Sequence, residues 1–275
     1  MLGGARRRAM LALSGAAGGG GGGGGGAARG PRGGSPPGVG AAPAPQGPPG
    51  APSPARVLPA CPVGGAVEAA AAALRAGGLV AVPTDTVYGV ACLAQDSRAL
   101  RALYRLKGRA GSKPVAVCLP DLEHVYRYCN VSLPDELLRD LLPGPVTLVL
   151  ERSEALNKDL NPFTPLVGIR IPSHWFIREL ARACAAPLAL TSANLSDEGS
   201  TLTVLEFQDL WPHLSLVIDG GPIGNIHRPE CRLGSTVVDL SVPGKFKVIR
   251  PGCALPQTIE ILVAKHGLST ELHGL

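Results

Sequence analysis

Short apolar runs alternate along the chain with stretches in which apolar residues recur every three or four positions. The short runs predict β-strands, and the longer spacing predicts amphipathic helices. We expect strands at 79–82, 115–119, 146–150, 167–171, 188–190, 216–218, 236–240 and 246–249. We expect helices at 67–76, 97–106, 122–129, 135–142, 175–184, 204–210 and 257–265. This mixture predicts the α/β class, here one mixed twisted sheet of α+β type covered by helices.

Polar residues and glycines mark the ends of several predicted helices. Asp96 stands directly before the helix 97–106, and Ser173 stands shortly before the helix 175–184. The side-chain oxygens of such residues accept hydrogen bonds from the unpaired N–H groups of a first helical turn. Gly77 and Gly78 end the first helix, because glycine readily leaves the helical conformation.

The start of the chain has the composition of a disordered segment. More than half of the 37 glycines lie in residues 1–67, including the unbroken run 18–26. Such a segment offers too little apolar area to offset the entropy of ordering its backbone. We therefore expect a disordered leader over residues 1–56 and one domain over 57–275, whose globular part begins near Val67.

The leader also holds the excess of positive charge. It has no carboxylate, since Glu68 is the first acidic residue, and it carries six arginines. Removing those six from 26 basic residues leaves 20 against 21 acidic residues, a formal charge of −1 for the remainder. An arginine-bearing, acid-free start is typical of a mitochondrial transit peptide, with a nonspecific low-complexity extension as the alternative. We expect the protein in both cytoplasm and mitochondrion.

No run of residues predicts a membrane span or a metal site. The apolar runs are shorter than the roughly 18 residues that a span needs, so we expect no transmembrane segment. The seven cysteines lie at least 11 positions apart, and no HExxH motif is present. This scatter predicts reduced, mostly buried thiols and no protein-bound transition metal.

Polar or glycine-rich residues follow several of the predicted strands. These segments are 84–86, 191–194, 220–221 and 250–252. If the strand ends share one side of the sheet, the segments line one cleft, which is where ligands bind in open α/β sheets. The alternative is that each is an ordinary polar loop.

Three cations stand close together between a predicted helix and a predicted strand. Lys107, Arg109 and Lys113 lie in a glycine-containing stretch, a combination that suits a polyphosphate. The stretch lacks the GxxxxGK[ST] pattern of a Walker loop. The alternative is a solvated helix C-terminus, where the helix dipole favours cations.

Two arginines occur in predicted apolar strands. A buried Arg170 needs an anionic partner, either an internal carboxylate such as Asp85 or Asp219 or an anionic group of a ligand. Arg250 ends another such strand. Ser192 is a poor candidate for a hydrolase nucleophile, because GxSxG is absent and no histidine lies near it in sequence.

Seven segments, in this order along the chain, closely resemble the YrdC family. They are 83–89 (PTDTVYG), 107–109 with 113–114, 143–147 (PGPVT), 168–172 (GIRIP), 191–194 (TSAN), 235–239 (STVVD) and 250–252 (RPG). The resemblance spans nearly all of the folded part. It implies a YrdC-like catalytic domain over 57–275 with a ligand cleft.

The resemblance implies an L-threonylcarbamoyladenylate synthase, a nucleotidyltransferase. Such an enzyme makes threonylcarbamoyl-AMP and diphosphate from L-threonine, bicarbonate and ATP, and Mg²⁺ would accompany the ATP. The product would pass to a tRNA threonylcarbamoyl transferase, in a KEOPS-type complex or its mitochondrial counterpart, for N6-threonylcarbamoyladenosine modification next to the anticodon. Direct binding of tRNA is left open.

The same resemblance implies the roles of ten residues. Thr84, Lys113, Arg170 and Ser235 would bind threonine or its carbamate. The nucleotide would contact Lys107, Arg109, Thr147, Ser192, Asn194 and Arg250, with Lys107 and Arg109 as the catalytic cations.

Two other function classes compete with this interpretation. One is an RNA-binding or ribosome-associated module without catalysis, which the charge of −1 and the few aromatic residues disfavour. The other is a sensor that binds threonine or ATP without turnover.

Overall fold

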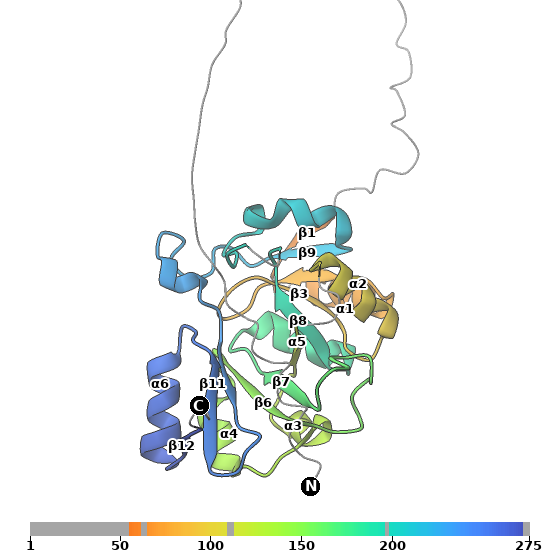
Figure 1. Ribbon diagram of the computed structural model, residues 1–275. Coiled ribbons are helices and arrows are strands. Elements are labelled where there is room, and N and C mark those ends of the chain that lie inside the picture. The colour runs from red at the N-terminus through yellow and green to blue at the C-terminus, as the bar shows by residue number, and fades with distance from the viewer. Residues whose placement is uncertain (1–54, 62–64, 109–112, 196–197, 272–275) are drawn as a thin grey trace, which may run out of the picture.

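One mixed sheet runs through the molecule in the strand order β1-β9-β2-β3-β8-β4-β7-β6-β10-β11-β12, with β5 paired to β6 (Figure 1). The computed structural model describes residues 55–61, 65–108, 113–195 and 198–271. Parallel pairs such as β6 with β10 stand beside antiparallel pairs such as β6 with β7, which confirms the predicted mixed sheet. The strands are β1 (Arg56–Pro59), β2 (Val80–Val82), β3 (Gly89–Leu93), β4 (Ala116–Cys118), β5 (Cys129–Asn130), β6 (Val146–Arg152), β7 (Leu166–Arg170), β8 (Leu188–Ser192), β9 (Leu216–Asp219), β10 (Thr236–Asp239), β11 (Lys245–Arg250) and β12 (Ser269–Thr270).

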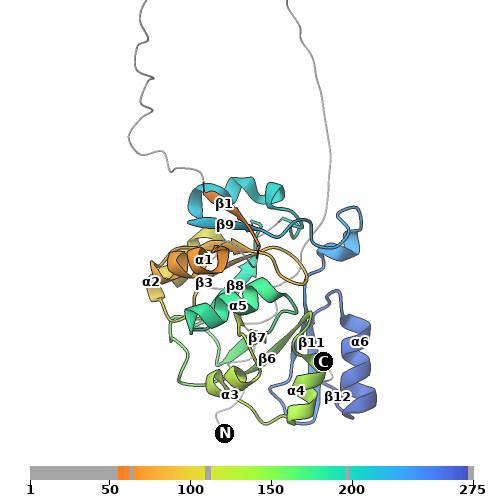
Figure 2. The ribbon, with the colours of Figure 1, turned by 180° about the vertical axis from the view of Figure 1, so that it is seen from behind.

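Helices pack on both faces of the sheet. The α1 and α5 helices cover one face, where Leu74 and Phe176 meet Val80 and Leu188 in a shared core (Figure 2). The other face packs against α2 and η2, with Leu100 and Phe207 in a second core. The helices are α1 (Ala66–Arg75), α2 (Ser97–Leu106), α3 (Glu123–Tyr128), α4 (Asp135–Leu141), α5 (Trp175–Cys184), η2 (Val204–His213), η3 (Pro229–Arg232), α6 (Leu255–Glu260) and η4 (Ile261–Lys265).

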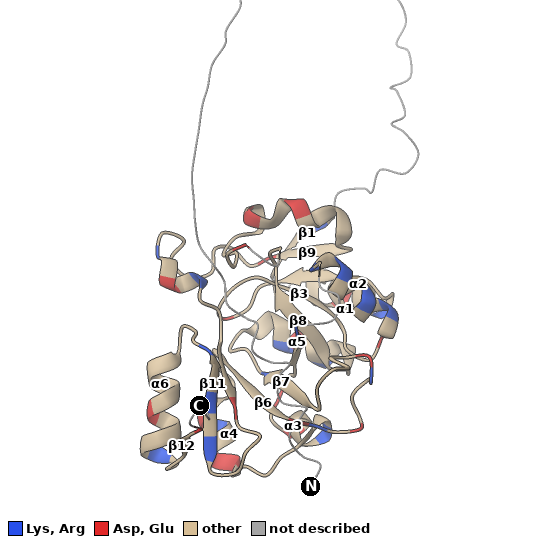
Figure 3. Ribbon diagram, in the orientation of Figure 1, with Lys and Arg blue, Asp and Glu red and all other residues tan. Residues whose placement is uncertain are grey.

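The α2 helix forms as its sequence pattern predicts. Asp96 caps it, because the carboxylate accepts hydrogen bonds from the N–H groups of Arg98 and Ala99 at 2.8 and 3.1 Å. Leu100 and Leu103 are fully buried on its inner side. Its outer side carries exposed arginines, which Figure 3 shows in blue.

The predicted cap of α5 is wrong. His174 precedes the helix, and its side chain caps no backbone group. The backbone N–H of Ser173 donates instead to the Asp85 carboxylate at 2.8 Å. This residue therefore ties the helix start to the loop after β2.

Several other elements differ from the sequence predictions, and the short elements β5, η3 and β12 were not predicted at all. The β3 strand was not predicted; it pairs with β2 and continues the chain directly after the polar loop. The sheet begins well before Val67, because β1 pairs with β9. The predicted helix 204–210 is a 3₁₀ helix with a kink at Phe207. The last helix begins at Leu255 and continues as a π-helix from Ile261.

Several predictions concern the termini and the thiols. The predicted leader lies outside the described residues except for Ala55 and Arg56. All seven cysteines are free. Three of them are buried, two are partly buried and two are exposed, so the prediction of mostly buried thiols is wrong. Burial raises the pKa of the Cys92, Cys118 and Cys129 thiols to about 12. In the part of the chain that is described, no helix is long and apolar enough to cross a membrane.

Candidate active site

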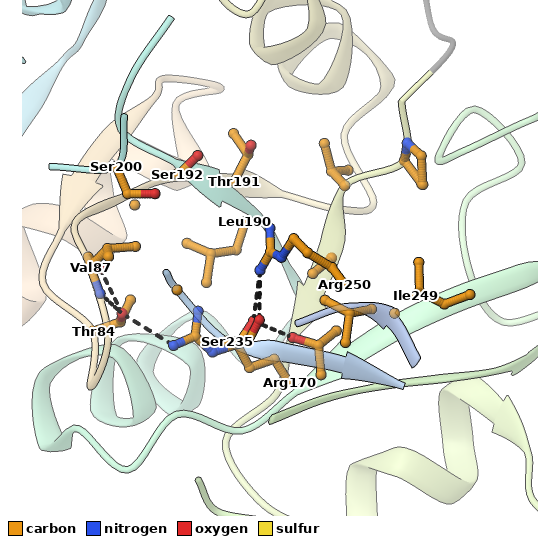
Figure 4. Close-up of a pocket in the computed structure, with 18 of the residues that line it drawn as sticks. Thr84, Val87, Arg170, Leu190, Thr191, Ser192, Ser200, Ser235, Ile249 and Arg250 are labelled. Atoms are coloured by element: carbon orange, nitrogen blue, oxygen red, sulfur yellow. Dashed lines mark hydrogen bonds between the residues drawn. The ribbon is translucent and has the colours of Figure 1, made fainter. Parts of the chain in front are cut away.

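An open pocket of about 920 Å³ lies over the middle of the sheet (Figure 4). Its floor is formed by one face of five consecutive strands, β8, β4, β7, β6 and β10. The floor residues are Leu190, Ala116, Gly168, Val149 and Val237.

Two small residues, Ala116 and Gly168, lie on neighbouring strands in the middle of the floor. A Cβ atom at Gly168 would lie 3.0 Å from the Thr147 methyl carbon, tighter than an ordinary contact. The floor residues alternate with core residues such as Leu148 and Ile169, which point to the opposite face. The two-residue period of the strands therefore separates the pocket from the core.

The ends of three segments supply the polar rim. Thr84 follows β2, Ser192 ends β8 and Arg250 ends β11, and all three line the same pocket. The prediction that polar strand ends share one cleft is therefore confirmed for them. Gly220 and Gly221 do not line it.

Arg170 is held at one side of the pocket by a buried ion pair. Its guanidinium donates to the Asp85 carboxylate at 2.6 Å, with side chains that are 8% and 9% exposed. It also donates to the hydroxyls of Thr84 at 3.3 Å and Thr86 at 2.5 Å. Of the two internal carboxylates considered, Asp85 is the partner. Arg170 thus enters the pocket in a fixed position with its charge already balanced on one side.

The loop after β2 is ordered by Thr84 and Tyr88. The Thr84 hydroxyl donates to the Val87 carbonyl at 2.6 Å and accepts from the N–H groups of Thr86 and Val87. The Tyr88 hydroxyl donates to the Gly221 carbonyl at 2.8 Å and accepts from the Gly220 N–H at 2.9 Å. Burial and the nearby Asp219 raise the pKa of Tyr88 to about 12, opposed by the Gly220 hydrogen bond. Its hydroxyl therefore remains a donor at neutral pH.

Hydroxyl and guanidinium groups from β6, β11 and the residue just before β10 also line the pocket. The hydroxyls of Thr147 on β6 and Ser235 before β10 lie 2.9 Å apart. Arg250 on β11 donates to the Ser235 carbonyl at 2.8 Å and to its hydroxyl at 3.2 Å. These groups converge on the pocket, as Figure 4 shows for Ser235 and Arg250.

Lys107 is buried beside the pocket, at the C-terminus of α2. Its side chain is 1% exposed, and its ammonium donates to the Ser192 carbonyl at 2.9 Å and to the Asn194 carbonyl. The solvated helix C-terminus considered above is therefore wrong for Lys107. The lysine connects α2 to the end of β8, on the rim of the pocket.

The structure brings most of the predicted site residues together. Six of them line the pocket: Thr84, Thr147, Arg170, Ser192, Ser235 and Arg250. Lys107 and Asn194 contact each other at its margin, and Lys113 directly precedes the lining residue Pro114. Arg109 lies outside the described residues. The binding roles of all ten residues stay predictions.

The apolar floor had no predicted role, although Gly168 and Val237 lie in the segments 168–172 and 235–239 that resemble the family. Val149 and Gly168 each lie two positions from a predicted site residue on the same strand, and Val237 lies two positions from Ser235, just before β10. Strand periodicity places such neighbours on the same face, so this spacing could have identified them.

Neither a metal centre nor a hydrolase triad is apparent in the described residues. No group of three or more His, Cys, Asp or Glu side chains there is arranged to hold a metal ion. No histidine is among the described residues that line the pocket. The polar side chains that line it carry hydroxyl groups and the guanidinium cations of Arg170 and Arg250, which suit the binding of anions.

A comparison with protein families assigns the chain to a family. The family model described as "Telomere recombination", for Sua5, YciO and YrdC proteins, matches residues 72–252. The chain belongs to the Sua5/YciO/YrdC family. This match contains every strand that forms the pocket floor, and it confirms the resemblance found in the sequence.

Individual relatives agree with the family assignment. The chain is 70% identical over 203 residues to the threonylcarbamoyl-AMP synthase of Homo sapiens, a match that covers 74% of this chain and 73% of the human protein. The crystal structure of P. abyssi Sua5 complexed with L-threonine is similar at 29% identity and a TM-score of 0.65, covering 74% of this chain and 58% of that one. E. coli YciO shares the fold, with 24% identity, a TM-score of 0.64, and coverage of 72% of this chain and 96% of that chain. This chain thus spans less than two thirds of the P. abyssi protein.

Proposed function

We propose that the chain is an enzyme that makes threonylcarbamoyl-AMP and diphosphate from L-threonine, bicarbonate and ATP. The observation that carries the proposal is one pocket lined by six of the residues assigned to threonine and nucleotide. The synthase named among its relatives at 70% identity and the threonine complex of P. abyssi Sua5 support the same activity. They do not favour an RNA-binding module without catalysis.

The reaction needs positioning and neutralisation of charge more than a protein nucleophile. The threonine amine and bicarbonate form a carbamate and release water. A carbamate oxygen then attacks the α-phosphorus of ATP, and the bond to the diphosphate breaks. Fixed cations and donors stabilise the charge that develops on the phosphate oxygens.

The pocket offers two groups of donors for this chemistry. Arg170 and Thr84 would bind the carboxylate of threonine or the carbamate, together with Ser235 and Lys113. The Arg170 Nε atom is buried and finds no hydrogen-bond partner among the described residues, which leaves a donor for an anionic ligand. Lys107, Arg109, Thr147, Ser192, Asn194 and Arg250 would contact the nucleotide.

Mg²⁺ belongs to the substrate in this proposal. The described residues offer no carboxylate cluster that would hold the ion, and Asp85 is already bonded to Arg170 and Ser173. The ion would therefore enter on the phosphate oxygens of ATP and offset part of their charge.

The decisive experiment measures product directly. The full chain is incubated with Mg²⁺, ATP, bicarbonate and L-threonine, and diphosphate and the adenylate are quantified by mass spectrometry. We expect diphosphate release that depends on threonine, and its near-complete loss in Lys107→Ala and Arg109→Ala. Lys158→Ala is the matched control, because that lysine is 88% exposed. A folded wild-type chain that yields no adenylate would overturn the proposal, and binding of tRNA by that inactive chain would favour the RNA-binding alternative.

Transfer of the product and the location of the protein are further parts of the proposal. A tRNA threonylcarbamoyl transferase would consume the adenylate, in the cytoplasm as a KEOPS-type complex and in the mitochondrion as its counterpart. The acid-free, arginine-bearing leader supports import into mitochondria. A reporter fused to residues 1–55 should appear in both compartments, and a purely cytosolic signal would contradict the targeting.

A further inference from the structure

Asn161 is a fully buried polar residue that does not line the pocket. It lies between β6 and β7 with 0% exposure and a φ of 46°. This left-handed conformation is unfavourable for residues other than glycine, although asparagine tolerates it best. A polar side chain in such a place needs hydrogen-bond partners to offset its burial.

The carboxamide of Asn161 pairs with both backbone groups of Val115. The Val115 N–H donates to Asn161 Oδ1 at 2.9 Å, and Asn161 Nδ2 donates to the Val115 carbonyl at 2.9 Å. The side chain thus acts as a neighbouring strand would, at the residue just before β4. Pro114, Val115 and Ala116 line the pocket and form what we call its β4 wall. Asn161 holds the middle residue of this wall through two hydrogen bonds.

The same residue also binds α2. The Tyr104 hydroxyl donates to Asn161 Oδ1 at 3.0 Å and accepts from the Asn161 backbone N–H at 3.0 Å. Tyr104 stands three positions, about one helical turn, before Lys107. One buried residue therefore joins the β4 wall of the pocket to the helix that carries the buried lysine.

The segment that leads to Asn161 is itself fixed. The Arg152 guanidinium donates to the carbonyls of Leu156 at 3.2 Å, Asn157 at 2.6 Å and Leu160. Asn157 Nδ2 donates to the Ser97 hydroxyl at 3.0 Å, near the start of α2. Asn161 thus ends a segment that is hydrogen-bonded to β6 and to the start of α2.

We propose that Asn161 is a positioning residue that sets the spacing between Lys107 and the β4 wall, and through it the affinity for the nucleotide. The role in turnover rests on the proposed function. Lys107 also bonds to the carbonyls of Ser192 and Asn194, so loss of Asn161 leaves the ammonium anchored while the wall beside it shifts. The effect on nucleotide binding is therefore a graded weakening.

Asn161→Gly is the variant that tests this role. Glycine adopts the left-handed conformation without strain, so the substitution removes the carboxamide and leaves the backbone unstressed. We expect the KM and the calorimetric Kd for ATP to rise about tenfold, equivalent to about 1.4 kcal/mol, with kcat changed less than about threefold.

Asn157→Ala is the matched control. It removes hydrogen bonds from the same segment but touches neither Tyr104 nor Val115. We expect it to lower the thermal midpoint without changing the Kd for ATP. A purely structural role for Asn161 would make the two variants behave alike.

Each outcome decides the proposal. An unchanged Kd for ATP in folded Asn161→Gly overturns it, as does an equal rise in Asn157→Ala. If Asn161→Gly does not fold, Tyr104→Phe replaces it: a Kd raised about threefold supports the role, and an unchanged Kd overturns it. A wild-type chain that binds ATP but makes no adenylate disproves the proposed function alone, because the comparison of Kd values still stands. A wild-type chain that does not bind ATP overturns both.

Discussion

At the scale of single residues, the buried ion pair of Asp85 and Arg170 both stabilises the fold and orients a cation that lines the pocket. It has the least exposed side chains among the ion pairs of the described residues. Asp85 also accepts the N–H of Ser173, so one carboxylate joins the pocket cation to the start of α5. Removing one partner of a buried pair leaves the other charge uncompensated, which costs more than the pair itself contributes.

Asp85→Ala should therefore destabilise the protein by about 3 kcal/mol in urea denaturation. It should also raise the KM for threonine, since Arg170 loses its fixed orientation. Asp121→Ala is the control, because Asp121 pairs with Arg178 and Arg182 while its side chain is 36% exposed. We expect that control to cost about 1 kcal/mol or less and to leave KM unchanged. Equal losses in the two variants would contradict this interpretation.

Residue chemistry made part of the site predictable. Because Arg170 lies in an apolar strand, the sequence predicts that it needs an anionic partner. Three candidates for that partner remained: Asp85, Asp219 and an anionic ligand. The choice of Asp85 depends on how the loop after β2 folds back toward the end of β7, which no local pattern specifies. Asn161 gave no signal at all, because its two partners lie 46 and 57 positions away.

At the scale of elements, the helices and strands with regular apolar periodicity were the ones that the sequence predicted correctly. The apolar stripe and the Asp96 cap predicted α2 to the residue at its start. The β3 strand was missed because only the six residues 83–88 separate it from β2, and its Gly89–Leu93 run is short. Local helix signals also could not distinguish the 3₁₀ helix η2, which has a kink at Phe207 and contains Pro212.

The contact between α4 and η4 should weaken in acid. Hydrogen bonds first from Lys265 and then from His266 hold the pKa of Asp140 below its usual range. A carboxyl whose folded pKa is depressed stabilises the fold above its unfolded pKa, about 3.9, and loses this contribution as pH falls through the folded value. Asp140→Asn should therefore lower the thermal midpoint at pH 7 but scarcely at pH 2.

An exposed pair on another element serves as the comparison. Asp159 lies 3.6 Å from Arg101, with side chains that are 54% and 63% exposed. Asp159→Asn should leave the midpoint nearly unchanged at both pH values. A loss in Asp140→Asn that persists undiminished at pH 2 would show that the carboxylate charge is not the cause.

At the scale of the whole molecule, the site depends on how helices are distributed over the sheet. The α1 and α5 helices cover the face formed by β9, β2, β3 and part of β8 and β4, and the same face stays open over β7, β6 and β10. The pocket fills this uncovered half. The strand order that produces it comes from crossover connections, which the sequence pattern does not reveal.

The far edge of the same sheet leads to a prediction about the domain boundary. Residues Arg56–Pro59 pair in parallel with β9, whose Leu216, Val217 and Ile218 are buried. A chain that begins at residue 55 keeps this edge strand, whereas a chain that begins at residue 66 exposes β9 as an apolar edge that can pair with other molecules. Loss of the strand and of the partly buried Leu58 should cost on the order of 2 kcal/mol, or roughly 4–8 °C in thermal midpoint.

Two truncated chains would measure this boundary against the full chain. Residues 55–275 should match the full chain in thermal midpoint and in threonine-dependent diphosphate release. Residues 66–275 should have a lower thermal midpoint and elute from size-exclusion chromatography partly as aggregates, because the β9 edge strand is unpaired. The pocket floor is unaffected by this truncation. If residues 66–275 stay monomeric with an unchanged midpoint, β1 is dispensable and the folded domain begins at α1, close to the start near Val67 that composition alone predicts.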